Sequence, residues 1–295
     1  MMEQTANNHP NALKIGRYHV ENKLGEGASG VVYRAYDPVM DRDVAIKSVK
    51  ADALTREQIY HAVMEFHHEA KIAGKYYHEN LVAIFDIIND GGLDHIVMEY
   101  VPGRSLMDYM IAVGPLEIDE TLAIVYKCCV ALAYVHYHGV IHRDVKPGNI
   151  IYHPAQGIVK LMDFSIAHHI EETPVRDNGT IAYMAPEHFD KDRKITYLTD
   201  IFALGATMYR MLTMKYPFTK ENTVFQILYQ SPAPVNEIRP EIPQVIADMV
   251  KKAMAKYDNE RFQSAAEFAH EIEVLFNKFY PGSDLINNSS NYMSI

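Results

Sequence analysis

Three short runs of residues in the second half of the chain hold the side chains needed to move a phosphoryl group to a hydroxyl. They read HRDVKPGN at residues 142–149, DFS at residues 163–165 and APE at residues 185–187. Asp144 is the predicted general base, because the attacking hydroxyl must lose its proton. Asn149 and Asp163 are the predicted ligands of Mg²⁺, which prefers hard oxygen donors and usually takes only one or two from protein.

A second set of residues upstream is suited to holding a triphosphate. It reads GEGASGVV at residues 25–32 and VAIK at residues 44–47. The glycine pattern also opens the helix of dinucleotide-binding units, but residues 31–36 are rich in β-branched and aromatic side chains and end at a turn signal, which predicts strands instead. A P-loop is excluded because no Lys-Ser or Lys-Thr pair follows the last glycine. Glycines between two strands let the backbone approach phosphates, since no Cβ stands in the way.

The elements that must position these residues change character along the chain. Strands are predicted at residues 81–88 and 95–100, joined by the turn NDGG. Apolar spacing and helix-boundary signals predict helices at residues 117–138, 199–214, 222–230, 243–256 and 264–279. A further helix is predicted after the capping box TREQ at residues 55–58. This order of elements indicates an α+β fold with a sheet-rich first part and a helical second part.

Taken together, these runs resemble the motifs of protein kinases, and in particular of bacterial eukaryotic-like (Hanks-type) serine/threonine kinases, over about residues 16–279. The bacterial likeness rests on IGRY, DVKPGN and RFQSA, which begin at residues 15, 144 and 261. The resemblance implies the two-lobed protein-kinase fold, with a small β-rich lobe carrying one main helix, a larger helical lobe and ATP in the cleft between them. The expected boundaries are a polar tail at 1–15, a kinase domain at 16–280 with lobes of about 16–101 and 102–280, and a disordered tail at 281–295.

The resemblance also assigns the nucleotide site. Lys47 is predicted to neutralise the α- and β-phosphates, but a lysine on a flexible stem needs a carboxylate to orient it. Glu65 and Glu69 share a helical face, so periodicity does not choose between them; the family pattern, in which this residue commonly precedes an alanine, favours Glu69. The residues expected to contact ATP are Leu24, Gly25, Glu26, Gly27, Ala28, Ser29, Gly30, Val32, Ala45, Lys47, Met98, Glu99, Val101, Ile151 and Asp163, with residues 98–101 resembling the gatekeeper and hinge that pair with adenine.

The substrate side follows from the same resemblance. Lys146, two residues after Asp144, implies that the acceptors are serine and threonine hydroxyls of proteins, the chain itself included. Thr180 is expected to bridge Asp144 and Lys146. The catalytic residues are therefore expected to be Asp144, Lys146, Asn149, Thr180, Lys47 and Glu69, with ATP and Mg²⁺, or Mn²⁺, as cofactors. As scaffolding, Asp200 is expected to hold the catalytic loop by its backbone N–H groups, and Arg261 to pair with Glu187.

The chain departs from the family pattern in its activation segment. Ser165 replaces the usual glycine after Asp163 and Phe164, and we expect the added Cβ to restrict switching between arrangements. Thr173 is the only hydroxyl between Ser165 and Gly179. A phosphate on Thr173 could pair with Arg143 and order the segment. The alternative is a plain loop threonine, because two glutamates at residues 171–172 already supply negative charge.

Two other functions share parts of this pattern. A nucleotide-binding pseudokinase scaffold is suggested by Ser165, but Lys47, Asp144, Asn149 and Asp163 are intact. A small-molecule kinase of the aminoglycoside type lacks the peptide-binding segment, which is complete here as GTIAYMAPE at residues 179–187. Kinases that require arginine upstream of the acceptor residue usually carry carboxylates where this chain has Ser105 and Gly148, so the resemblance disfavours a strict preference for basic substrates.

Composition narrows the class of protein further. The net charge of −10 argues against nucleic acid as the main partner, since phosphate contacts need clustered Lys and Arg. Cys128 and Cys129 are adjacent in a predicted helix, which indicates buried packing in a reducing compartment rather than a disulfide. The N-terminus lacks the apolar core of a signal peptide, and no apolar run approaches the ~20 residues that span a bilayer. We therefore expect a cytoplasmic protein that does not insert into a membrane. Apart from His142, the 15 histidines fall at no functional position of the pattern and are expected on the surface or in the core.

Overall fold

The computed structural model describes residues 13–27, 30–49, 64, 67, 71, 74–163, 181–219 and 221–282. These residues form two compact units. The first, the small lobe, combines the chain up to Tyr76 with Ala83–Val101, and the second, the large lobe, combines Tyr77–Val82 with the chain from Pro102 onward. The expected helix after residue 55 and both predicted tails fall wholly or largely outside the described residues.

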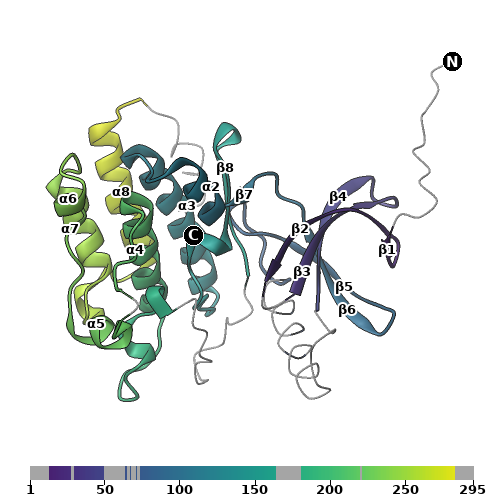
Figure 1. Cartoon of the computed structure of the whole chain (residues 1–295), viewed down its shortest axis with the longest axis horizontal. Coiled ribbons are helices and arrows are strands. Elements are labelled where there is room, and N and C mark those ends of the chain that lie inside the picture. Colours follow the sequence, from purple (N-terminus) through teal and green to yellow (C-terminus); the bar gives the residue numbers. More distant parts are fainter. Residues whose placement is uncertain are drawn as a thin grey trace. The chain divides into compact units, whose positions relative to one another are not determined.

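The small lobe is built on one antiparallel sheet of six strands in the order β1-β2-β3-β4-β6-β5 (Figure 1). The strands are β1 (Lys14–Ile15), β2 (Tyr18–Gly27), β3 (Gly30–Asp37), β4 (Arg42–Ser48), β5 (Ile84–Asp90) and β6 (Leu93–Glu99). Tyr18, Ala35, Val44, Ile46 and Val97 form its buried core. The predicted strands on both sides of the glycine loop are confirmed. The strand predicted from residue 81 begins only at Ile84, because Leu81 forms an isolated bridge with Leu161 in the large lobe.

The large lobe is mainly helical, with one small three-stranded sheet (Figure 1). That sheet contains β7 (Arg104–Ser105), β8 (Ile150–His153) and β9 (Ile158–Leu161). The helices are α2 (Leu106–Val113), α3 (Ile118–Tyr137), α4 (Leu198–Thr213), α5 (Thr223–Tyr229), α6 (Val235–Ile238), α7 (Gln244–Ala253) and α8 (Ala265–Phe279). All five helices predicted in this lobe are confirmed to within a few residues. Helices α2 and α6 were not predicted, because they are too short to show a clear apolar period.

Helix α4 runs through the core of the large lobe. Every residue of this helix except Arg210 is buried, polar Thr199, Asp200 and Thr207 included. A helix that is enclosed on all sides is held by packing rather than by one amphipathic face. It packs against α3 and α7, so its side chains are fixed reference points for the loops that surround it.

The prediction of buried thiols is confirmed. Cys128 and Cys129 lie inside α3 without a disulfide, and burial raises the pKa of Cys128 to about 12.

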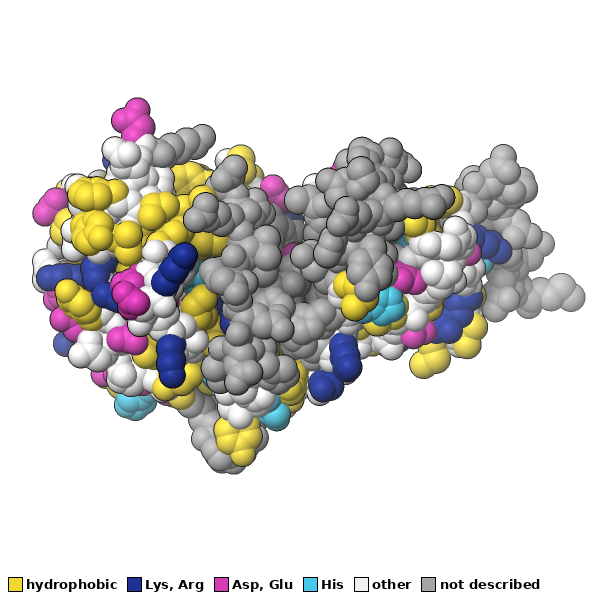
Figure 2. Space-filling model, turned by 90° about the horizontal axis from the view of Figure 1, so that it is seen from below, with side chains coloured by type: hydrophobic (Ala, Val, Ile, Leu, Met, Phe, Trp, Pro, Cys, Tyr) yellow, Lys and Arg dark blue, Asp and Glu magenta, His cyan; other side chains and the backbone are white. Residues whose placement is uncertain are grey.

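Within the described part of the chain, no helix combines the length and the apolar character needed to cross a bilayer. On the face shown in Figure 2, hydrophobic side chains gather on the large lobe beside interspersed basic and acidic ones.

Candidate active site

The glycine loop joins β2 and β3, and its glycines differ in what surrounds them. Gly30 has a φ of +144°, and a Cβ there would lie 2.2 Å from the Ser48 carbonyl oxygen of β4. The fold itself therefore requires glycine at this position. A Cβ on Gly25 or Gly27 would meet no atom of the described residues within 4 Å, and neither has a left-handed φ. The fold gives no reason for these two glycines, whereas a ligand pressed onto the backbone would.

Four residues of the small lobe that are predicted to bind the nucleotide share one face of the sheet. Lys47 is buried on β4 and lies opposite Val32 of β3 and Ile96 of β6. Ala45, two residues before Lys47, lies opposite Met98. Because residues two apart on a strand and residues directly opposite each other point to the same side, Val32, Ala45, Lys47 and Met98 line a common surface.

Glu99, in the predicted hinge, is held by hydrogen bonds within the small lobe. The Glu99 backbone N–H donates to the Ala83 carbonyl oxygen at 2.8 Å. The Ala83 N–H donates in turn to the Glu99 carboxylate at 3.2 Å.

The other predicted ATP contacts differ in their setting. Val101 is buried, whereas Leu24 on β2 is 45% exposed. Glu26 also lies on β2, and its carboxylate is paired with the Lys23 ammonium. Ile151 belongs to the large lobe, where it pairs with Lys160 across β8 and β9.

Asp200 of α4 fixes the start of the catalytic loop, as predicted. Its Oδ2 accepts the His142 backbone N–H at 2.8 Å, and its Oδ1 accepts the Arg143 N–H at 2.7 Å. Arg143 has a φ of +65°, an uncommon conformation for a residue with a Cβ. Such strained residues persist only where their surroundings over-determine them. The buried carboxylate of Asp200 supplies that constraint.

His136 contacts the same Asp200 carboxylate, a role that its position in the sequence did not predict. Its Nε2 lies 2.8 Å from Asp200 Oδ2, and both side chains are buried. Burial acts to raise the pKa of Asp200, but the hydrogen bond and charge of His136 and the loop contacts outweigh it, so the pKa lies below its ordinary value of 3.8. The expectation that His142 was the only histidine at a functional position is therefore corrected.

Asp144 lies in a buried polar network inside the loop. Its Oδ2 is 2.7 Å from Lys146 Nζ and accepts a hydrogen bond from Asn149 Nδ2 at 2.8 Å. Asn149 Nδ2 also donates to the Asp144 carbonyl oxygen at 2.9 Å. The second carboxylate oxygen, Oδ1, is buried and accepts no hydrogen bond from any described residue. Asp144 thus has one oxygen fixed in place and the other without a donor, which suits the capture of a proton.

Asn149 and Asp163 offer oxygen donors of the kind that a hard divalent cation prefers. The hydrogen bonds of Asn149 use its amide nitrogen, so its amide oxygen has no donor among the described residues. The Met162 N–H donates to the Asn149 carbonyl oxygen at 2.9 Å and brings the end of β9 beside the loop. Asp163 follows with a φ of +69°. A carboxylate and a free amide oxygen fit a hard divalent cation.

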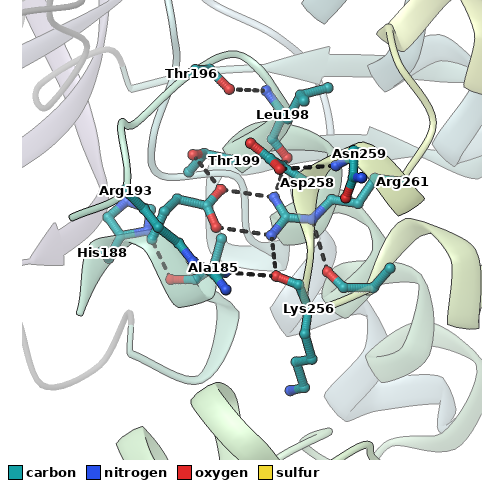
Figure 3. Close-up of polar contacts among 12 residues, drawn as sticks. Ala185, His188, Arg193, Thr196, Leu198, Thr199, Lys256, Asp258, Asn259 and Arg261 are labelled. Atoms are coloured by element: carbon teal, nitrogen blue, oxygen red, sulfur yellow. Dashed lines mark hydrogen bonds and ion pairs between the residues drawn. The ribbon is translucent and has the colours of Figure 1, made fainter. Parts of the chain in front are cut away.

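The Glu187–Arg261 pair predicted from the sequence is confirmed. Arg261 Nη1 and Nη2 donate to the two oxygens of Glu187 at 2.7 and 2.8 Å, and the Thr199 hydroxyl donates to Oε1 at 2.8 Å (Figure 3). Arg261 Nε donates to the Ala255 carbonyl oxygen. Burial acts to raise the pKa of Glu187, but the hydrogen bonds and charge of Arg261 outweigh it, so the pKa lies below its ordinary value of 4.5. The pair ties residues 181–189 to α4 and to the segment before α8.

The remaining predicted residues lie outside the described part of the chain. They are Ala28, Ser29, Glu65, Glu69, Ser165, Thr173 and Thr180. The choice between Glu65 and Glu69, the bridging role of Thr180 and the regulatory role of Thr173 therefore stay predictions.

Known proteins show the same family. The sequence matches the family model described as protein kinase domain over residues 18–272. It is 32% identical over 268 residues to the serine/threonine-protein kinase PrkC of Bacillus subtilis. The aligned region covers 88% of this chain and 41% of PrkC. It is 35% identical over 268 residues to the serine/threonine-protein kinase PknB of Mycobacterium leprae, which covers 87% of this chain and 42% of PknB. The chain thus spans about two fifths of the length of these relatives. Because the family match takes in the glycine loop, the catalytic loop and the Glu187–Arg261 pair, this chain belongs to the protein kinase domain family.

Proposed function

We propose that this protein is a serine/threonine protein kinase, which transfers the γ-phosphoryl group of ATP to serine and threonine hydroxyls of proteins, itself included. The observation that carries the proposal is the setting of Asp144, with one oxygen held by Lys146 and Asn149 and the other buried without a donor among the described residues. A substrate hydroxyl placed against this second oxygen hydrogen-bonds to it and passes its proton to it as the new bond to phosphorus forms. The names of PrkC and PknB support the same acceptor class.

The residues around Asp144 supply the other needs of the reaction. Lys146 places a positive charge beside the base, where it offsets negative charge on the transferred group. Asn149 Oδ1 and the Asp163 carboxylate are the proposed ligands of Mg²⁺ or Mn²⁺. When bound, the metal neutralises charge on the phosphates. Asp200 and His136 keep the loop in its strained form, so the base is positioned before the substrate arrives.

The small lobe supplies the nucleotide contacts in this proposal. The common face of Val32, Ala45 and Met98 is apolar and suits the adenine ring, while Lys47 on the same face meets the phosphates. The backbone at Gly25 and Gly27 is proposed to cover the phosphates. The Glu99 N–H already donates a hydrogen bond to the Ala83 carbonyl oxygen. A hydrogen bond between Glu99 and adenine would therefore use the Glu99 carbonyl oxygen as the acceptor.

Two glycine substitutions separate structural from nucleotide-binding roles. Gly30→Ala is expected to destabilise the small lobe by about 1–3 kcal/mol, because it adds a Cβ at a left-handed φ against the Ser48 carbonyl. Gly27→Ala is expected to leave the thermal midpoint near that of the wild type and to weaken ATP binding several-fold. Thermal unfolding and ATP titration distinguish the two. Equal losses of stability in both variants, without any change in ATP affinity for Gly27→Ala, contradict this division.

Phosphoryl transfer itself is tested with the purified chain, γ-labelled ATP and a generic protein substrate, in Mg²⁺ or Mn²⁺. Acid hydrolysis of the labelled protein is expected to release phosphoserine and phosphothreonine. Label on tyrosine shows that the proposed acceptor class is wrong. ATP binding without transfer to any protein supports the pseudokinase scaffold instead.

A further inference from the structure

Arg210 is the single arginine of α4. It is the one residue of α4 that is not buried. Arg193, Arg239 and Arg261 each contact a carboxylate. Arg210 contacts no carboxylate of the described residues within 4.0 Å. In a chain with a net charge of −10, a cation that projects from a buried helix without an acidic partner calls for an explanation.

The contacts of Arg210 use only part of its guanidinium group. Nη1 donates to the Met214 carbonyl oxygen at the end of α4. The flat face stacks on the Tyr216 ring, 4.2 Å from its centroid. Nε is buried and makes no hydrogen bond to a described residue, and neither does Nη2. Helix capping and stacking therefore account for one nitrogen and one face and leave the Nε–Nη2 edge unused.

The same edge binds a carboxylate elsewhere in this protein. Arg17 donates from Nε and Nη2 to the two oxygens of Asp37, at 3.1 and 3.0 Å. This side-on arrangement is one of the strong bidentate geometries of arginine with a carboxylate. The corresponding edge of Arg210 has the same donors and no acceptor among the described residues.

Tyr183 connects Arg210 to the segment expected to bind the peptide. Tyr183 lies within residues 179–187, and its ring meets the Tyr216 ring edge-on at 6.0 Å between centroids. Its 3₁₀ turn, Ile181–Tyr183, packs against α4. The Tyr183 hydroxyl is buried and has no hydrogen-bond partner among the described residues. Tyr216, in contrast, is 41% exposed. Two unsatisfied polar groups thus lie around one partly open aromatic ring.

We propose that Arg210, with Tyr183 and Tyr216, forms a substrate subsite for an acidic side chain next to the acceptor residue. The inference rests on the proposed kinase function, which it deepens by naming a substrate class. The Nε–Nη2 edge of Arg210 receives the carboxylate, and the Tyr183 hydroxyl can donate to it as well. An arginine or lysine in the substrate is repelled by the same cation. Ser105 and Gly148 carry no negative charge, so these two positions give no support to a preference for basic substrates.

The test uses a series of peptides with one serine acceptor, in which Glu, Ala or Arg stands at each flanking position in turn. At one position, the wild type is expected to show a kcat/KM for the Glu peptide about tenfold above that for the Ala peptide. Arg210→Glu should reverse this order and favour the Arg peptide at that position. Arg210→Lys, which keeps the charge but loses the edge geometry, should retain a smaller preference for Glu. Lys251→Glu on α7 makes the same change of net charge away from the subsite and is expected to preserve the wild-type order.

The outcomes separate this subsite from a purely structural role. If Arg210 only caps α4, Arg210→Glu lowers the thermal midpoint and reduces kcat/KM for all peptides by one factor, and the proposal is wrong. An unchanged Glu-over-Ala ratio in an active Arg210→Glu enzyme is equally decisive against it. If the wild type phosphorylates no peptide and no protein, the kinase function itself is wrong, and the subsite proposal is overturned with it.

Discussion

Asp144→Asn is expected to lower kcat for phosphoryl transfer by about 10²–10⁴-fold, the usual contribution of a positioned general base. The remaining carbonyl oxygen of the new amide can still accept the hydrogen bonds of Lys146 and Asn149, so the loop should keep its geometry. The amide nitrogen then replaces the buried Oδ1, and it cannot take a proton from the substrate. ATP affinity should stay within about twofold of the wild type, since the nucleotide contacts belong to other residues.

Labelled transfer at saturating ATP measures the loss, and nucleotide titration checks binding. Asp248→Asn is a matched control, because Asp248 is an exposed carboxylate on α7 that bonds to Gln244. This control should show wild-type kcat. If Asp144→Asn retains more than a tenth of the wild-type kcat, Asp144 is not the base, and the setting of its oxygens has another purpose.

Arg261→Met is expected to destabilise the large lobe by about 3–5 kcal/mol, because it leaves the Glu187 carboxylate buried without its countercharge. Glu187 would retain the hydroxyl of Thr199 as a partner, which satisfies one lone pair but does not balance the charge. The double variant Glu187→Gln with Arg261→Met should recover part of this loss, since a neutral amide is less costly to bury than an unpaired carboxylate. Urea unfolding of the single and double variants measures the coupling.

The same pair predicts a pH dependence with a defined sign. The pKa of Glu187 is lowered by folding, so its contribution to stability is present above its ordinary value of 4.5 and is lost as the pH falls through its lower folded-state pKa. In Arg261→Met, burial dominates and should raise the pKa of Glu187 above 4.5. The gap in stability between wild type and variant should therefore be largest near neutral pH and narrow toward pH 4.5 and below.

Lys252→Met provides the matched control for this second prediction. Lys252 pairs with Glu267 at 2.9 Å, but both side chains are more than a third exposed. An exposed pair contributes about 0–1 kcal/mol, so this variant should unfold close to the wild type at every pH. A loss for Arg261→Met no larger than that for Lys252→Met contradicts the importance assigned to the buried pair.

The contacts among Asp144, Lys146 and Asn149 join side chains that are close together in the chain. Asp144 and Asn149 are five positions apart, and the geometry of this network follows from a 3₁₀ turn with proline at its first position. The cap of α8 is local in the same way, because the Ser264 hydroxyl accepts the Glu267 N–H three residues later. The strands around the glycine loop and the longer helices were also recognisable, since their apolar periods extend over whole elements.

Contacts between distant residues were decided by the tertiary structure. His136 and Asp200 are 64 residues apart, and only the packing of α3 against α4 reveals that a histidine on an apolar stripe supports the catalytic loop. The exposure of Arg210 is also a tertiary property, because it depends on the burial of every other residue of α4. The two pairs predicted at long range, Asp200 with the loop and Arg261 with Glu187, came from family resemblance rather than from local pattern. Local periodicity carries no information about such contacts, because they form only when separate elements pack together.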